Sequence, residues 1–490
     1  MSIDSEARHF ETEKVNPYLD YPNKPILLGD ISEAKENRII HWTRSGNAVI
    51  NLPNGEKVNI HSENQLERIE PTINALLGNL TPGSQYEELF NTEKDRYEES
   101  LIKSGGDIRK LNYGELVYYP QKNDLVWFAP RGLKMLAWLA RNEIQLKDPD
   151  QKISWKEQRE VLGKQVVGVV GGSVGKDILD RTRDVFLNNW LKIADPDIFD
   201  DANRNRVRFG YRDSMQNKSE VAAMHIHETD PWLPISIYQE GIYPRNINNF
   251  MLGNEKTGEP ALTLAVEVCD DPDRKIDVGQ VCKKYGIPLW RLTDFGKTFQ
   301  VEYYPYDKIT DFPLAIGVRD DRLFETREVW KNNPANRELF FDFAFALVGN
   351  HWKNDPEFAD FIYQRNKTPF TKGIPQTAIA SEGGASHTAL HMASTLLGWK
   401  QPNRYFVDLR SGVQITEYQE KYFDTWVLTR DTQRMSEGTM THEVILVDSD
   451  FRVEFTQADR SGNVYRELYN DEKQEVVVEA FGSHLFPIKT

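Results

Sequence analysis

Three glycines follow an apolar run and could bind a phosphate group. The run covers 166–170, and Gly171, Gly172 and Gly175 come directly after it, ahead of a helical stretch. Glycines between a strand and a helix let the backbone approach a phosphate, and the helix N-terminus adds oriented N–H groups and a partial positive charge. The same spacing occurs where a helix packs tightly on a sheet. Taken alone, the glycines therefore leave phosphate binding and tight packing as equal alternatives.

An acidic residue ends the next strand-like run. Asp195 follows 190–194. An acid at the carboxyl end of the second strand of such a unit can accept hydrogen bonds from both ribose hydroxyls. At this point NAD, FAD and ATP all remain possible ligands.

A set of polar residues downstream separates these ligands. The pattern Asp195-Pro-Asp197 is followed by Asn203, Arg206, Lys218 and Asp270. In order and spacing, these residues resemble the ThiF/MoeB/ubiquitin-activating-enzyme-like family of adenylyltransferases, over roughly 139–409. Within that family the sequence looks most like the bacterial multi-domain ThiF-type branch. The family's usual Gly-x-Gly-Gly-x-Gly turn is replaced here by Val170-Gly-Gly-Ser173-Val-Gly.

The resemblance implies a role for each of these positions. Gly171, Gly172 and Gly175 would hold the phosphates of ATP, Asp195 the ribose, and Asn203 a phosphate or the ribose. Asp270 would hold Mg²⁺. In this family an arginine of the facing subunit also reaches the triphosphate, and Arg141 falls where that residue is found. The resemblance therefore implies a homodimer with two composite sites.

The charges fit the chemistry that the resemblance implies. Attack of a carboxylate on the α-phosphate brings two anions together, so cations at the phosphoryl oxygens should lower the barrier most. Arg206 and Lys218 are the candidates, and Arg141 and Asp270 complete the catalytic set. We expect an ATP- and Mg²⁺-dependent nucleotidyltransferase that activates a carboxylate as an acyl-adenylate and releases pyrophosphate. The resemblance implies that the carboxylate is the C-terminus of a ubiquitin-like protein or a peptide.

Two other classes of protein remain open. A dinucleotide-binding oxidoreductase would use the glycines and Asp195, but it has no need of Arg206, Lys218 and Asp270 together. A non-catalytic relative would bind nucleotide or a partner tail without chemistry. Tight ATP binding without exchange of pyrophosphate would identify the second class.

The two cysteines argue against a covalent thioester and against a disulfide framework. Cys269 and Cys282 are the only cysteines in the chain, and none follows Cys282. The thiol with which true ubiquitin-activating enzymes form a thioester therefore has no counterpart, and the zinc-binding cysteine pairs of many relatives are absent too. We interpret both cysteines as packing residues.

Composition excludes several partners. The chain has 490 residues with 60 Lys and Arg against 75 Asp and Glu, a net charge of -15. Such a field repels a phosphate backbone, so nucleic acid is a poor partner. No run of eighteen or more apolar residues predicts a membrane span, and residues 1–14 lack an apolar signal core. We expect a cytoplasmic protein.

The elements that must position the site follow an α/β pattern. Strand-like runs at 166–170, 190–194, 234–238, 262–268 and 288–292 alternate with helical stretches, which predicts a doubly wound, mostly parallel sheet. We expect this ATP-binding domain to cover 131–410. An N-terminal α+β accessory domain would cover 1–130, with a hairpin at 116–128, and a small β-rich appendage would cover 411–490.

Overall fold

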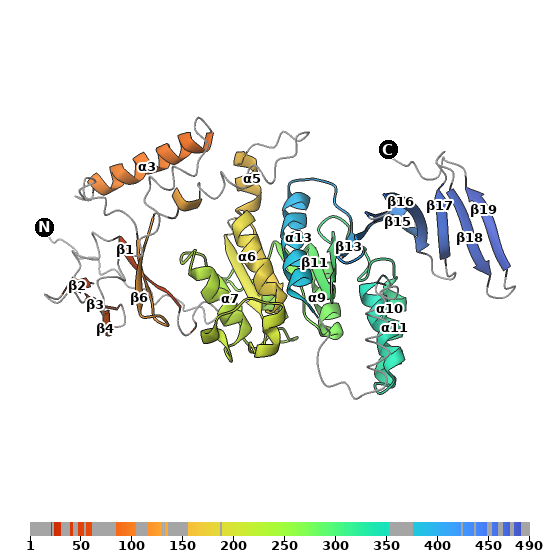
Figure 1. Cartoon of the computed structure of the whole chain (residues 1–490), viewed down its shortest axis with the longest axis horizontal. Coiled ribbons are helices and arrows are strands. Elements are labelled where there is room, and N and C mark those ends of the chain that lie inside the picture. Colours follow the sequence, from red (N-terminus) through yellow and green to blue (C-terminus); the bar gives the residue numbers. More distant parts are fainter. Residues whose placement is uncertain are drawn as a thin grey trace, which may run out of the picture.

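The structure is a computed structural model of the whole chain. It describes residues 21, 24–30, 40–42, 48–52, 55–60, 85–103, 115–129, 131, 133–135, 155–186, 189–349, 351, 376–422, 425–435, 438–447, 453–458, 464–470 and 475–481. In Figure 1 the N-terminal sheets lie at one end of the molecule and the last strands at the other. The α/β part lies between them, so the described chain is elongated.

The N-terminal part contains two small antiparallel sheets and one long helix. One sheet has the order β1 (Ile26–Asp30), β5 (Glu115–Tyr119), β6 (Asp124–Phe128); the other has β2 (Ile40–Trp42), β3 (Ala48–Asn51), β4 (Lys57–Ile60). Helix α3 spans Gln85–Lys103. Leu28, Ile50 and Leu116 are buried in one shared cluster. The β5–β6 hairpin confirms the one expected at 116–128.

Five parallel strands form the centre of the large sheet. They are β7 (Val166–Val170), β8 (Trp190–Ala194), β9 (Ile235–Tyr238), β10 (Leu264–Glu267) and β11 (Leu289–Phe295), in the order β11-β10-β7-β8-β9. Continuous apolar runs are typical of parallel strands that are covered on both faces. The chain order reverses between β7 and β10. This reversal is the switch point at which α/β sheets of this kind bind ligands.

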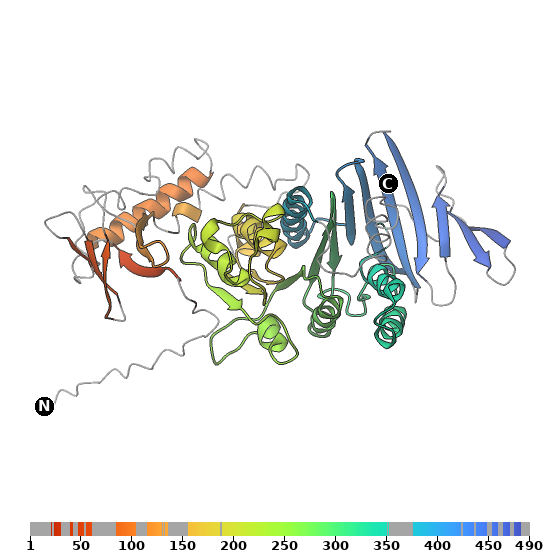
Figure 2. The same ribbon diagram turned by 60° about the horizontal axis from the view of Figure 1, so that its bottom comes forward.

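Helices cover both faces of this sheet, as a doubly wound fold requires (Figure 2). One face carries α5 (Trp155–Leu162), α6 (Val174–Phe186), α7 (Lys218–His227) and α13 (Ala378–Leu396). The other carries α8 (Ile247–Leu252), α9 (Pro272–Tyr285), α10 (Asp320–Asn332) and α11 (Arg337–Val348). The mixed α/β fold expected from the sequence is confirmed. Each strand buries alternate side chains in one or the other of two apolar cores.

Local sequence explains where these helices begin. The Asp271 side chain accepts hydrogen bonds from the N–H groups of Asp273 and Arg274, and Pro272 takes the first position of α9. Helix α13 starts at Ala378 and contains the glycine pair at 383–384. Thr377 caps this start, and Gly384 packs closely on Leu292 of the sheet.

Antiparallel strands extend the same sheet beyond β11. They are β12 (Thr298–Tyr304), β13 (Arg404–Asp408), β14 (Val413–Tyr422), β15 (Thr425–Arg434), β16 (Thr439–Val447), β17 (Val453–Ala458), β18 (Val464–Asn470) and β19 (Glu475–Phe481). Among the described residues, thirteen strands thus form one sheet. The strands expected after residue 410 are present, and β14 pairs directly with β13.

Buried ion pairs hold this extension to the α/β part. Arg404 on β13 lies 2.8 Å from a Glu302 oxygen on β12 and 2.7 Å from a Glu417 oxygen on β14. All three side chains are almost fully buried, so an unpaired charge among them would be costly. The domain boundaries proposed at 130 and 410 stay a prediction.

No helix in the described ranges has both the length and the apolar character needed to cross a membrane.

Candidate functional site

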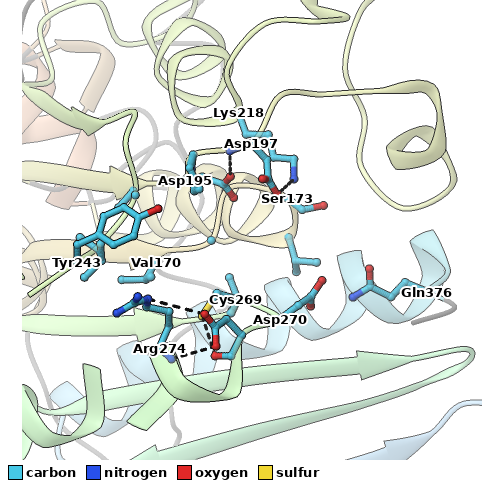
Figure 3. Close-up of a pocket in the computed structure, with 18 of the residues that line it drawn as sticks. Val170, Ser173, Asp195, Asp197, Lys218, Tyr243, Cys269, Asp270, Arg274 and Gln376 are labelled. Carbon is cyan, nitrogen blue, oxygen red and sulfur yellow. Dashed lines mark hydrogen bonds and ion pairs between the residues drawn. The ribbon is translucent and has the colours of Figure 1, made fainter. Parts of the chain in front are cut away.

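A cavity lies at the switch point of the sheet. Its volume is about 340 Å³, and its walls come from the carboxyl ends of β7, β8 and β10 and from the segments that follow them. The volume falls within the usual range for small-ligand pockets. Figure 3 shows acidic, basic and hydroxyl side chains converging on this space. Five of the residues chosen from sequence line it: Gly171, Asp195, Arg206, Lys218 and Asp270.

The glycine turn forms part of the cavity wall. Gly171 has a φ of 107°, a conformation that favours glycine, and a side chain there would lie 3.0 Å from the backbone of Val268 and Cys269. A Cβ on Gly172 would lie 2.8 Å from the Cβ of Lys218. Gly175 packs against β7 instead, where a Cβ would lie 2.7 Å from a Val169 methyl group. The first two glycines thus shape the site, whereas the third seats α6.

Asp195 is buried between two backbone donors. The Gly172 N–H donates to its Oδ2, and the Asp197 N–H donates to its Oδ1 at 2.8 Å. Burial raises the pKa of the Asp195 carboxyl, and the Lys218 charge and the two N–H groups oppose that rise. Each carboxylate oxygen can accept a second hydrogen bond. Asp195 therefore keeps acceptor capacity for a ligand in the cavity.

Lys218 is the first residue of α7 and forms an ion pair with Asp197, which also lines the cavity. Its Nζ lies 3.0 Å from Asp197 Oδ2, and the lysine side chain is 9% exposed against 68% for the aspartate. Asn217 caps the helix with its side chain and donates from Nδ2 to the Asp195 carbonyl at 2.9 Å. The cap thus fixes the position of the lysine relative to β8. An ammonium group held in this way can bind an anion without moving far.

Arg206 reaches the glycine turn from the loop after β8. Its Nε donates to Ser173 Oγ at 3.3 Å. Both side chains line the cavity. Ser173 stands where the family has a glycine, and its hydroxyl gives the guanidinium a partner close to the turn. The turn and the arginine are therefore linked before any ligand binds.

The end of β10 supplies the remaining acid. Asp270 is exposed at the cavity wall, beside Cys269. Behind them Glu267 is fully buried; it accepts from the Cys269 N–H at 2.7 Å and from Lys275 Nζ at 3.0 Å. Burial and the Glu267 charge hold the pKa of the Cys269 thiol well above its ordinary value. The buried pair fixes the backbone that presents Asp270.

The comparison with protein families now identifies this part of the chain. The ThiF family model matches residues 156–294, which include the glycine turn, Asp195, Arg206, Lys218 and Asp270. Residues 156–294 belong to the ThiF family. The matched segment covers all five parallel strands except the last residue of β11. The family assignment expected from the sequence is confirmed for this ThiF domain.

A similar sequence is found in a much longer protein. The chain is 30% identical over 174 residues to "Uncharacterized protein MT1398" of Mycobacterium tuberculosis (strain CDC 1551 / Oshkosh). The match covers 36% of this chain and 23% of that protein. This chain therefore spans less than a quarter of that relative's length.

Solved structures with a similar arrangement are distant. PaaA is 14% identical with a TM-score of 0.40, covering 67% of this chain and 94% of that one. E. coli MccB is 13% identical with a TM-score of 0.36, covering 85% and 93%, and has also been solved with ATP. The E. coli tRNA N6-threonylcarbamoyladenosine dehydratase TcdA is 12% identical with a TM-score of 0.34, covering 55% and 96%. TM-scores below 0.5 give these likenesses no weight for the function of this chain.

Three residues expected at the site do not line the cavity of the ThiF domain directly. Gly172 lies behind Asp195, and Gly175 packs on β7. Asn203 is buried in a short 3₁₀ helix, Asp201–Asn205, where its Oδ1 accepts from the Asp200 N–H at 3.1 Å. Its carbonyl accepts from the Arg206 N–H at 3.1 Å. Asn203 therefore supports the loop that carries Arg206. Arg141 lies outside the described residues.

Sequence reasoning missed several residues of the cavity wall. Tyr243 lies there 37% exposed, with the guanidinium carbons of Arg274 and Arg245 at 5.0 and 5.3 Å from its ring centre. Gln376 enters from the chain that leads into α13, far along the sequence. The sequence did point to Ser173, because it departs from the glycine pattern. No local motif marked Tyr243 or Gln376 as a residue of the cavity.

Proposed function

We propose that the ThiF domain of this chain adenylates a carboxylate with ATP and releases pyrophosphate. One observation carries the proposal: Arg206, Lys218 and the exposed carboxylate of Asp270 line a single cavity beside the glycine turn, together with the further charged residues Arg274, Asp197 and Asp271. A hydride-transfer site has no use for this set. The proposed substrate is the C-terminal carboxylate of a peptide or of a ubiquitin-like protein.

ATP would lie across the switch point. The glycine turn and the start of α6 would receive the phosphates, because N–H groups at a helix N-terminus attract anions. Asp195 would accept from the ribose hydroxyls with its remaining acceptor positions. The base would lie toward Tyr243, whose exposed ring offers a stacking surface beside the apolar side chain of Ile242.

The reaction joins two anions, and the cations would reduce that cost. A carboxylate oxygen attacks the α-phosphorus, and the bond from that phosphorus to the oxygen bridging the β-phosphate breaks. The electron pair of that bond leaves with pyrophosphate. Arg206, already hydrogen-bonded to Ser173, and Lys218, already paired with Asp197, would neutralise charge that grows on the phosphoryl oxygens.

The donor set fits Mg²⁺. Magnesium is usually held by one or two carboxylates together with substrate phosphates. Asp270 is an exposed carboxylate in the cavity wall, next to the exposed Asp271, and no cluster of three or more His, Cys, Asp or Glu ligands occurs within the described part of the chain. We propose that Asp270 holds Mg²⁺ jointly with the phosphates of bound ATP. The bound ion would neutralise phosphate charge.

The acyl group would not pass to a thiol of this chain. No cysteine follows Cys282, which is buried in α9. The Cys269 thiol borders the cavity, but its raised pKa keeps it protonated and therefore a poor nucleophile. We propose that the acyl-adenylate itself is the product or is consumed by an external nucleophile.

A homodimer with shared sites forms part of the proposal. The resemblance of the sequence implies that Arg141 corresponds to the arginine that relatives supply to the facing subunit. Arg141 would add a further cation to Arg206, Lys218 and Arg274, which line the cavity.

ATP–pyrophosphate exchange tests the proposed reaction. Purified protein is assayed with pools of peptides that carry a free C-terminus, beside Asp270→Ala and the exposed control Asp321→Ala. Exchange that needs both peptide and Asp270, and that survives in the control, supports adenylation. Absence of exchange together with tight NAD or FAD binding would favour the oxidoreductase. Absence of exchange with ATP bound would favour the non-catalytic relative.

A further inference from the structure

Gln376 is anchored at the cavity wall by its side chain and its backbone. Its Nε2 donates to Asp294 Oδ1 at 2.8 Å, and its carbonyl accepts from Asn205 Nδ2 at 2.8 Å. Its backbone also pairs with Gly296 in an isolated bridge. Figure 3 shows Gln376 on the same side of the cavity as Asp270. Gln376, which is distant in sequence from the other residues of the cavity, is thus fixed in the cavity wall on the side of Asp270.

Asp294 determines which way this carboxamide faces. It is buried near the end of β11 and accepts a second hydrogen bond from Ser381 Oγ on α13 at 2.6 Å. An ionised carboxylate only accepts hydrogen bonds, so the amide nitrogen of Gln376 must face it, and the amide oxygen is turned away. Burial raises the pKa of Asp294 to about 6, so it is mostly ionised at neutral pH. The Gln376 amide nitrogen therefore faces an ionised Asp294 carboxylate at neutral pH.

The oxygen of this carboxamide is left for a ligand. Within the described ranges, Gln376 Oε1 accepts no hydrogen bond, while the side chain lines the cavity. A phosphate or a carboxylate offers this oxygen only acceptors, which would repel it. A peptide bond offers an N–H donor. The peptide N–H would donate to Gln376 Oε1, while the carbonyl of the same trans peptide bond points away from the glutamine.

We propose that Gln376 reads the last peptide bond of a peptide substrate, and that Asp294 is the positioning residue that fixes its orientation. The inference rests on the proposed adenylation for the place of the substrate carboxylate. It narrows the substrate class from any carboxylate to one that carries an amide N–H next to its terminal residue. Simple organic acids and esters would be poor substrates.

Two matched peptide pools test this specificity. One contains N-acetylated hexapeptides with the last two residues varied; in the other, an ester replaces the last amide because the C-terminal residue is the matching α-hydroxy acid. The rate constant kcat/KM for pyrophosphate exchange is measured for each pool at pH 8. Loss of one neutral hydrogen bond predicts a preference for the amide pool of about threefold to tenfold in the native protein.

Variants separate this role from a structural one. Gln376→Ala should bring the preference close to one. Asp294→Asn should do the same, because the new amide can donate to Oε1 and turn it away from the cavity. The double variant Asp294→Asn with Gln376→Glu should regain the preference, since the introduced asparagine amide then donates to one oxygen of the introduced carboxylate and leaves the other facing the ligand. Gln280→Ala, exposed on α9, is the control and should keep the native preference.

Binding of both pools in the presence of the non-hydrolysable analogue AMPCPP separates the two proposals. Exchange with equal kcat/KM for amide and ester overturns the role of Gln376 and leaves adenylation standing. Selective binding of the amide pool without exchange supports the role of Gln376 and contradicts adenylation. If neither pool binds or exchanges, the peptide specificity is wrong. Retained preference in Gln376→Ala also overturns it.

Discussion

Replacing Gly172 by alanine should disable the site more than it destabilises the fold. An added Cβ would lie 2.8 Å from the Cβ of Lys218 and 2.9 Å from the Cβ of Asp195, where ordinary contacts begin at 3.4 Å. Both neighbours are the first side-chain atoms of their residues, so they can retreat only if their backbones move. The Gly172 N–H that donates to Asp195 would move with them.

The geometry sets the magnitude. Relief of the clash requires a displacement of about half an ångström or more, and a misplacement of about 1 Å at a reacting site can cost about a hundredfold in rate. We expect kcat/KM for pyrophosphate exchange to fall about tenfold to a hundredfold, which corresponds to about 1.4 to 2.8 kcal/mol. Overpacking should also lower the free energy of unfolding by about 1 to 3 kcal/mol.

Gly175→Ala is the matched control. Its Cβ would lie 2.7 Å from a Val169 methyl group, a clash of similar depth on the core side of α6, and its approach to the cavity residue Val268, at 3.4 Å, is an ordinary contact. Both variants are compared by thermal unfolding and by exchange at a temperature well below both transitions. If Gly172→Ala keeps its activity within threefold of the native protein, the reasoning about this close approach is wrong. Equal activity losses in the two variants would also contradict it.

Three further predictions concern charge. Arg206→Ala or Lys218→Ala should each lower the exchange rate about a hundredfold, because each would remove a cation from the transition state. Asp177→Asn should raise the free energy of unfolding at pH 7, measured in urea, by about 1 to 3 kcal/mol. The reason is that burial raises the pKa of Asp177 from 3.8 to about 6, and its Oδ2 has no hydrogen-bond partner among the described residues. Native stability should fall as the pH rises from about 4 to about 6, and the variant should lack this fall. Mixing Arg141→Ala with Asp270→Ala protein should restore part of the activity, since shared sites regenerate one intact centre.

Each of these predictions has a control. Arg212→Ala, exposed and outside the cavity, should stay within twofold of the native exchange rate. Activity within a few-fold in the Arg206 variant would show that the phosphate cations are wrongly assigned. Asp184→Asn, which removes a half-exposed carboxylate of the same helix that is paired with Arg183, should keep the native fall in stability between about pH 4 and about pH 6. Absence of rescue on mixing, despite proven subunit exchange, would count against shared sites.

The parallel strands could be predicted closely from sequence. The boundaries expected for β7 and β8 agree with the structure, because strands covered on both faces are mostly apolar; the one charged residue of the two, Lys192, is buried and paired with Glu259. β11 runs to Phe295, three residues beyond the expected end. Its last part, Thr293 and Asp294, is polar, and pairing with β12 keeps it in the sheet. The local apolar pattern cannot predict a stretch of strand that stays in the sheet only because it pairs with a neighbouring strand.

Part of the site could be predicted for a similar reason. Asp195 and Asp270 lie just after the carboxyl ends of two parallel strands, so their positions in the chain already place them at one edge of the sheet. Asn203 followed the same pattern, yet its side chain supports its own loop. The role of Ser173 depended on where Arg206 points, which is decided by packing of the loop after β8. Spacing alone could not distinguish a ligand-facing amide from a structural one.

The sequence by itself determined the α/β pattern, the glycine turn and the charged residues of the ThiF domain, because these follow from short-range spacing and residue type. Only the tertiary structure decided that β14 continues the sheet of β13, and that Asp294 and Gln376 meet at the cavity. Gln376 lies 82 residues beyond Asp294 in the chain. Contacts over such a separation arise from packing of α13 on β11 and carry no mark in the local sequence.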